Sequence, residues 1–117
     1  MIPDKARELG RLIGQSDEYG ALKRAQTRAE GAAELRERMQ QIRKMALKLE
    51  EQAERGTPPA EADVTGYDEL LTKIQADPLY QSVVSAQSNF DKLMLKVNEQ
   101  ILGGIEKGAA SPIITLG

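Results

Sequence analysis

The chain has 117 residues, with 16 Lys and Arg against 18 Asp and Glu, and this length and near-neutral charge predict one modest domain. The absence of His and Cys excludes His-based triads, cysteine nucleophiles, disulfides and thiolate-bound metal clusters. A net charge of −2 argues against a strongly cationic nucleic-acid binder. Apolar residues make up 40% of the chain, but 14 of them are Ala, so we expect a thin core whose helices complete their burial against another chain.

Helix signals begin at the first residues, whereas β-branched residues are scattered and predict no strand. Four apolar residues recur at spacings of 4, 3 and 4: Ile2, Ala6, Leu9 and Ile13. With the stop supplied by Gly14, they predict a helix over residues 3–13. Ser16 is a typical N-cap residue and predicts a second helix that ends or bends near Gly31.

Two longer segments each carry a heptad seam with spacings of 4, 3, 4, 3 and 4. In residues 32–55 this seam consists of Leu35, Met39, Ile42, Ala46, Leu49 and Ala53. In residues 79–107 it consists of Leu79, Val83, Ala86, Phe90, Leu93 and Val97, with Ile101 and Ile105 continuing it. The run Gly56-Thr57-Pro58-Pro59 ends the first segment, and a shorter helix over residues 60–76 precedes the Asp77-Pro78 start of the second.

These elements predict an all-α fold built on a long antiparallel helical hairpin, with short flanking helices and oligomerisation through helix faces. We expect one domain over residues 1–107 and a flexible tail over residues 108–117. The predicted helix-pair and oligomer interface joins the two seams: Leu35, Met39, Ile42 and Leu49 against Val83, Phe90, Leu93, Val97 and Ile101.

Further apolar residues lie beside the two main stripes: Leu12, Met45, Leu47, Val84, Met94, Leu95 and Leu102. A two-helix seam leaves such side faces uncovered. They predict a second contact surface, used for self-association or for a protein partner.

Basic residues concentrate in the segment 32–55, and the candidates for a nucleic-acid ridge are Arg36, Arg43, Lys44 and Lys48. Two interpretations stand: a row that follows RNA phosphates, or a solvated helix face. The solvated face is favoured, because Glu34, Glu37, Glu50 and Glu51 are interleaved at helix-pair spacing.

Nothing in the pattern predicts catalysis. The clustered carboxylates lack a predicted cleft, and Ser82, Ser85 and Ser88 lack a base to activate them. We therefore expect no enzyme activity, no cofactor, no bound metal and no small-molecule substrate. No stretch of 18 consecutive apolar residues is present, so we expect a cytoplasmic protein that does not insert in a membrane.

The C-terminal segment is uncharged and carries Pro112, Ile113, Ile114 and Leu116. One interpretation is a flexible end, disordered when free. The other is an extended segment that adds to a sheet edge or lies in a groove of a partner.

Several short signatures together resemble the YlbF/YmcA family over residues 2–107: the Lys5–Gly10 and Ser16–Tyr19 segments, Leu22-Lys23 with Ala25, Asp77-Pro78, Ala86-Gln87, Phe90, Leu93, Val97-Asn98 and Ile101. The resemblance implies a small all-helical bacterial regulatory protein that forms dimers or hetero-oligomers. Family members are associated with biofilm, competence and sporulation control, and with a complex that directs an endoribonuclease toward mRNA maturation. Some bind iron–sulfur clusters through cysteines, which this chain lacks.

The leading hypothesis is a non-enzymatic cytoplasmic adaptor that binds its own copy and then another protein, with an RNA-processing complex as one partner to consider. The alternative is an RNA-contacting accessory factor that uses the basic ridge. A third hypothesis is a purely structural helical domain of a larger assembly.

Overall fold

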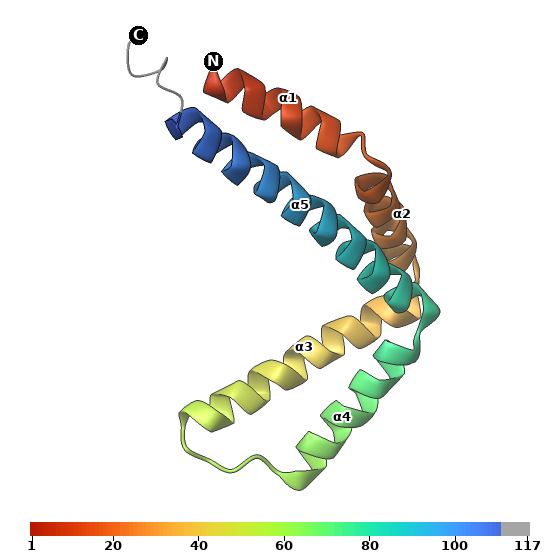
Figure 1. The fold of residues 1–117 in the computed structure, drawn as a ribbon. Helices are drawn as coiled ribbons and strands as arrows, with labels where there is room; N and C mark the ends of the chain where they lie inside the picture. The colour runs from red at the N-terminus through yellow and green to blue at the C-terminus, as the bar shows by residue number, and fades with distance from the viewer. Residues whose placement is uncertain (111–117) are drawn as a thin grey trace.

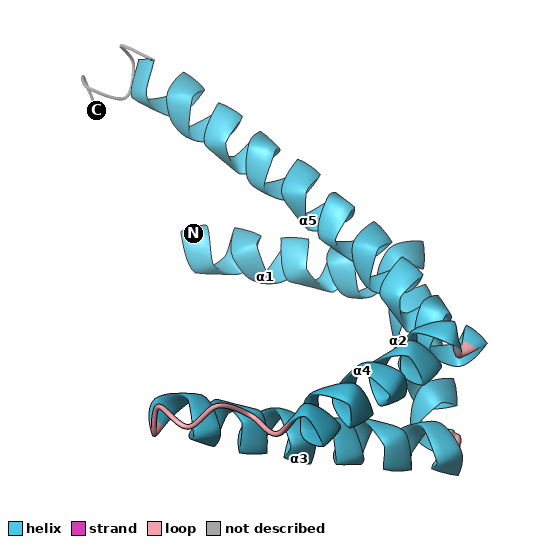
Figure 2. Ribbon diagram, turned by 90° about the horizontal axis from the view of Figure 1, so that it is seen from below, coloured by secondary structure: helices cyan, strands magenta, loops and turns pink. Residues whose placement is uncertain are grey.

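The computed structural model describes residues 1–110, which form five helices and no strand (Figures 1 and 2). The helices are α1 (Ile2–Gly14), α2 (Asp17–Gly31), α3 (Ala33–Glu54), α4 (Glu61–Ala76) and α5 (Pro78–Ala110). The all-α prediction is confirmed. The two interpretations of the segment around Pro112, Ile113, Ile114 and Leu116 fall outside the described residues.

The helices form a V with two arms (Figure 1). The first arm contains α1, α2 and α5, the second contains α3 and α4, and the arms meet at an elbow where α2 passes into α3 and α4 into α5. The molecule extends 69 × 37 × 19 Å with a radius of gyration of 21.7 Å. A compact domain of this length would have a radius of gyration of about 13 Å. Much helix surface therefore stays in water.

Local caps fix the helix boundaries as the sequence predicted. The Ser16 Oγ accepts a hydrogen bond from the Tyr19 N–H at 3.1 Å, which caps α2. The Asp77 Oδ1 accepts the Leu79 N–H at 2.9 Å at the start of α5. After α3, Gly56 adopts a φ of 70°, a left-handed conformation that glycine adopts without strain.

The core of the second arm is formed where α3 packs antiparallel to α4. Its buried residues are Leu35, Ile42, Leu70 and Ile74. Ile74 is only 1% exposed, which makes it the most buried large side chain of the described residues. The first turn of α5 adds Leu79 and Tyr80 to this cluster, so the second arm is closed at its elbow end.

The core of the first arm is smaller and lies between α2 and the first half of α5. Leu22, Ala25 and Ala86 are buried there. The rings of Tyr19 and Phe90 lie beside them at a centroid distance of 5.6 Å in a tilted arrangement. The remaining half of α5 extends beyond α2, because α2 has 15 residues and α5 has 33.

The antiparallel hairpin motif is present, but the partners of the two long helices differ from those expected and need correction. We expected Leu35, Met39, Ile42 and Leu49 of α3 to face Val83, Phe90, Leu93 and Val97 of α5. Instead α3 packs on α4, and α5 packs on α2. The loop after α3 returns the chain directly as α4, whose apolar face covers the apolar stripe of Leu35 and Ile42 before α5 begins.

The end of α5 also differs from the prediction. The helix continues through Gly103 and Gly104 to Ala110, so residues 108–110 belong to α5 and not to a tail. The boundary predicted at residue 107 therefore lies inside a helix.

Candidate functional site

Exposed apolar side chains gather on α1 and on the second half of α5. Ten large apolar side chains are exposed within residues 1–110, and seven of them lie on or beside α1 or on the second half of α5: Met1, Ile2, Leu12, Leu95, Ile101, Leu102 and Ile105. α1 contains no buried residue. An exposed apolar patch of this kind marks an interaction surface more often than a catalytic cleft.

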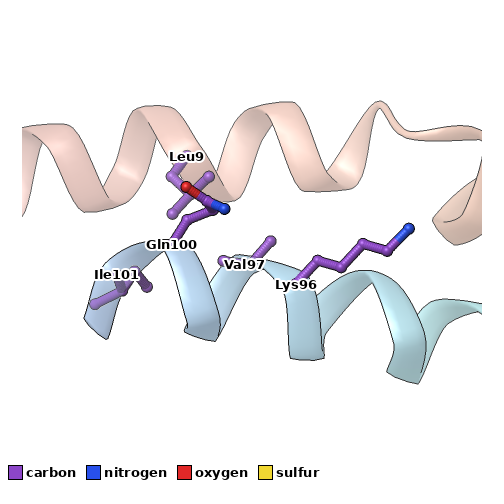
Figure 3. Close-up of a pocket in the computed structure, with 5 residues that line it drawn as sticks. All are labelled: Leu9, Lys96, Val97, Gln100 and Ile101. Atoms are coloured by element: carbon purple, nitrogen blue, oxygen red, sulfur yellow. The ribbon is translucent and has the colours of Figure 1, made fainter. Parts of the chain in front are cut away.

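α1 and the second half of α5 run beside each other without closing (Figures 1 and 2). A groove of about 380 Å³ lies between them, lined by Leu9 of α1 and by Lys96, Val97, Gln100 and Ile101 of α5. In Figure 3, Leu9 points from α1 toward Gln100 and Val97 on the facing helix. We call this open space between the two helices the fork.

Helical periodicity extends the apolar walls of the fork to its open end. Ile2 lies seven residues before Leu9 and so on the same face of α1, while Ile105 follows Ile101 by one turn of α5. Ile2 is 83% exposed and Ile105 is 59% exposed. The fork therefore has apolar residues on both walls, and no element among residues 1–110 covers them.

Charge on the two walls is opposite in sign. The five charged residues of α1 sum to one net positive charge, and residues 97–110 of α5 sum to one net negative charge. These charges are exposed, so each contributes little by itself. They do favour placing an α1 wall against an α5 wall.

The structure separates the residues that we predicted as one interface. Leu35 and Ile42 are buried against α4, and Met39 packs at the edge of the same cluster. Val83 and Phe90 pack against α2. The members of the predicted set that reach the fork are Val97 and Ile101, while Leu49 and Leu93 are half-buried elsewhere.

Of the seven side chains predicted to form a second contact surface, five are exposed: Leu12, Leu47, Val84, Leu95 and Leu102. Met45 and Met94 are half-buried instead. Val84, Leu95 and Leu102 are spaced by 11 and 7 residues and so share one face of α5, away from the fork. We call this second surface the outer stripe.

The four basic side chains of the candidate RNA ridge on α3 have different surroundings. The Lys48 Nζ lies 3.3 Å from the Asp63 Oδ2, in an ion pair with α4. The Arg36 guanidinium donates to the Glu30 carbonyl oxygen at 2.8 Å. Arg43 lines a groove of about 490 Å³ at the elbow together with Tyr80. Lys44 is exposed to solvent.

Residues 1–110 contain no group of three or more Asp, Glu, His or Cys side chains placed to hold a metal ion. None of the five helices has an apolar window that would let it cross a bilayer.

Sequence reasoning identified most of the fork residues but missed the fork itself. Ile2 and Leu9 were assigned to a helical stripe, and Ile101 and Ile105 to the seam of the last helix. What it missed is that α2 is too short to cover that end of the seam. The signal was available in the unequal lengths of the two predicted helices.

The fold and the fork define a small all-α protein whose candidate site is an apolar docking surface between helices. A family model described as "Control of competence regulator ComK, YlbF/YmcA" matches residues 2–106. The chain belongs to this family of regulatory proteins, which confirms the resemblance predicted from its sequence signatures.

Similar proteins cover nearly the whole chain. A UPF0342 protein of Bacillus mycoides (strain KBAB4) is 24% identical over 106 residues, which are 91% of each chain. A UPF0342 protein of Staphylococcus saprophyticus is 21% identical over 104 residues, 89% of this chain and 91% of the relative. A solved structure, titled as a protein of unknown function (DUF964) from Bacillus stearothermophilus, has a TM-score of 0.65 at 17% identity and covers 95% of this chain and 97% of its own. The structural match supports the five-helix fold.

Proposed function

We propose that this protein is a non-enzymatic regulatory adaptor that works through helix-mediated association, with the fork binding the fork of a second copy. The observation that carries the proposal is the apolar surface on both walls of the fork, which residues 1–110 leave in water. The family description, control of a competence regulator, supports a regulatory role.

A second copy fits the fork because the two walls match in length and differ in charge. α1 has 13 residues and residues 97–110 of α5 span 14, each about 20 Å long at 1.5 Å per residue. A two-fold axis places α1 of each copy against α5 of the other, which pairs a net positive wall with a net negative one. The product is a four-helix arrangement with the apolar residues inside.

The energy balance makes this association sensitive to single charges. Each copy brings five apolar side chains to the fork: Ile2, Leu9, Val97, Ile101 and Ile105. At about 1–1.5 kcal/mol for each partly exposed side chain, burial in the pair contributes about 10–15 kcal/mol. The entropic cost of association is about 4–15 kcal/mol. A buried, unpaired carboxylate would therefore abolish the dimer.

The adaptor role uses the surface that a fork dimer leaves free. The outer stripe of Val84, Leu95 and Leu102 faces away from the fork, so it stays accessible to another protein in the dimer. We place this second contact in the cytoplasm, with developmental control or an RNA-processing complex as the process it serves.

Sedimentation velocity tests the fork contact. We expect the wild-type protein to be dimeric in about 1 M NaCl, where exposed ion pairs are screened. A variant that combines Ile101→Asp and Ile105→Asp sediments as a monomer with an unchanged helical circular dichroism signal, because both side chains are 46% or more exposed in the single chain.

A variant that combines Val84→Asp and Leu95→Asp is the matched control, since it places the same two charges on exposed positions of α5 outside the fork. It retains the dimer. A wild-type protein that stays monomeric at high concentration would refute the proposal, as would a double variant that associates as well as wild type.

A further inference from the structure

α3 carries an ordered charge pattern on the face that points away from α4. The exposed residues of this face change from basic to acidic along the helix, with one leucine between the two groups: Gln40, Arg43, Lys44, Leu47, Glu50, Glu51 and Glu54. Leu47 is 60% exposed. We call these seven residues the α3 seam.

The sequence before and after the C-terminal part of α3 is divided in the same sense. Residues 22–48 carry a net charge of +5, and residues 49–77 carry −6. The near-neutral total therefore hides two opposite charges of considerable size.

This order is unfavourable for the helix on its own. The C-terminus of a helix is the negative end of its dipole, yet Glu50, Glu51 and Glu54 lie toward that end of α3 and its last turn holds no basic residue. Glu50 and Glu54 are also like charges one turn apart, which repel. Within residues 1–110 none of Arg43, Lys44, Glu50 and Glu51 takes part in an ion pair. The charges of the seam are thus arranged for a partner outside the chain.

A second α3 in the opposite direction is the partner that this order fits. Arg43 and Glu51 lie four residues before and after Leu47, and Lys44 and Glu50 lie three residues before and after it. An antiparallel copy centred on Leu47 therefore brings each basic residue to an acidic residue of the other chain, twice over by symmetry. The two helix dipoles also run in opposite directions, which is favourable.

We propose that the α3 seam is a self-complementary contact that joins two copies antiparallel, with Leu47 of each copy on the two-fold axis. It is distinct from the fork and does not depend on it. Because its pairs are exposed, the contact is weak and salt-sensitive. In about 50 mM salt it joins fork dimers into larger assemblies, and in about 1 M salt it releases them.

Disulfide trapping tests the contact, since the wild-type chain has no cysteine. Leu47→Cys places the only thiols of the pair next to each other on the axis. We expect it to form a disulfide-linked dimer about ten-fold faster in low salt than in about 1 M NaCl. Ser88→Cys, an exposed position on α5, is the control and cross-links slowly at both salt concentrations.

Charge reversal tests the pairing. In the Leu47→Cys background, Arg43→Glu with Lys44→Glu slows cross-linking to the rate of the control, and so does Glu50→Lys with Glu51→Lys. Mixing these two variants restores fast cross-linking between unlike chains, because every pair across the axis is then again of opposite sign. If like charges still faced each other across the two-fold axis, mixing the two variants would not restore fast cross-linking.

Three results would overturn the inference: equal rates for Leu47→Cys and Ser88→Cys, no effect of either reversal, or no recovery on mixing. The fork variant Ile101→Asp/Ile105→Asp separates this inference from the proposed function. With Leu47→Cys added, that variant still forms the disulfide between two α3 helices, because it disrupts the fork contact alone. A charge-reversed chain without the added cysteine remains a fork dimer, because the reversal disrupts the α3 contact alone.

Discussion

The two arms use the same motif, a pair of antiparallel helices, but they leave different amounts of apolar surface in water. In the second arm α4 runs along α3 and buries Leu35, Ile42, Leu70 and Ile74. In the first arm α2 covers only the first half of α5, and α1 lies beside the second half without burying a residue. Unequal helix lengths therefore concentrate the uncovered surface at one place. The second arm holds the larger buried cluster, and the first arm carries the uncovered apolar surface.

The largest expected effect is in the closed arm. Replacing Ile74 by Ala removes the most buried large side chain of residues 1–110 and leaves a cavity, so the free energy of unfolding should fall by about 4 kcal/mol. Denaturant unfolding measures this change. Val64→Ala on the same helix, where Val64 is 38% exposed, should change it by less than about 0.5 kcal/mol. Equal effects would contradict the assignment of the core.

In the first arm the same kind of truncation should cost less. Phe90→Ala removes the ring that packs on Tyr19, but Phe90 is half-buried, so we expect a loss of about 2 kcal/mol in unfolding free energy. Tyr19→Phe keeps the ring pair and should be nearly neutral. A loss from Phe90→Ala as large as that from Ile74→Ala would remove the distinction between the arms.

The start of α2 gives a smaller effect. Ser16→Ala removes the hydroxyl that caps the Tyr19 N–H, and we expect it to lower the unfolding free energy by about 1 kcal/mol. Ser82→Ala removes an exposed hydroxyl that donates to the Pro78 carbonyl oxygen within α5, and it should lower the unfolding free energy by less. Thermal unfolding followed by circular dichroism distinguishes the two variants.

The smallest expected effect has the opposite sign. Gly104→Ala should stabilise the second half of α5 by about 0.5–1 kcal/mol, because an added Cβ meets no atom within 4 Å and alanine favours the helix. Amide hydrogen exchange over residues 103–110 should slow accordingly. Gly56→Ala, at a φ of 70°, should destabilise the protein instead.

Helix positions were predictable because their signals are local. Ser16, Gly56 and the Asp77-Pro78 pair act through the backbone of their own neighbours, and each marks a boundary that the structure shows. Helix partners were not predictable from spacing alone. The stripe that contains Leu35 and Ile42 has the period of every other stripe in the chain, so the length of each connection decides which helix covers it.

The candidate site was predictable to the same extent. Residues off the main stripes, such as Leu95 and Leu102, were expected to be exposed and are. Ile101 and Ile105 lie on the main stripe and were expected to be covered, yet they are exposed because α2 does not reach them. Periodicity shows which face of a helix is apolar, and only the tertiary arrangement shows where the cover ends.

One residue on each side of the elbow joins the arms: Ala32 between α2 and α3, and Asp77 between α4 and α5. Two parallel links of this length leave little slack, and Pro78 fixes one more backbone angle directly after the second link. The two arms therefore meet at a fixed angle. Anything held on one limb sits at a set distance and orientation from anything held on the other, and lengthening both links by a glycine would loosen that geometry while leaving each limb folded.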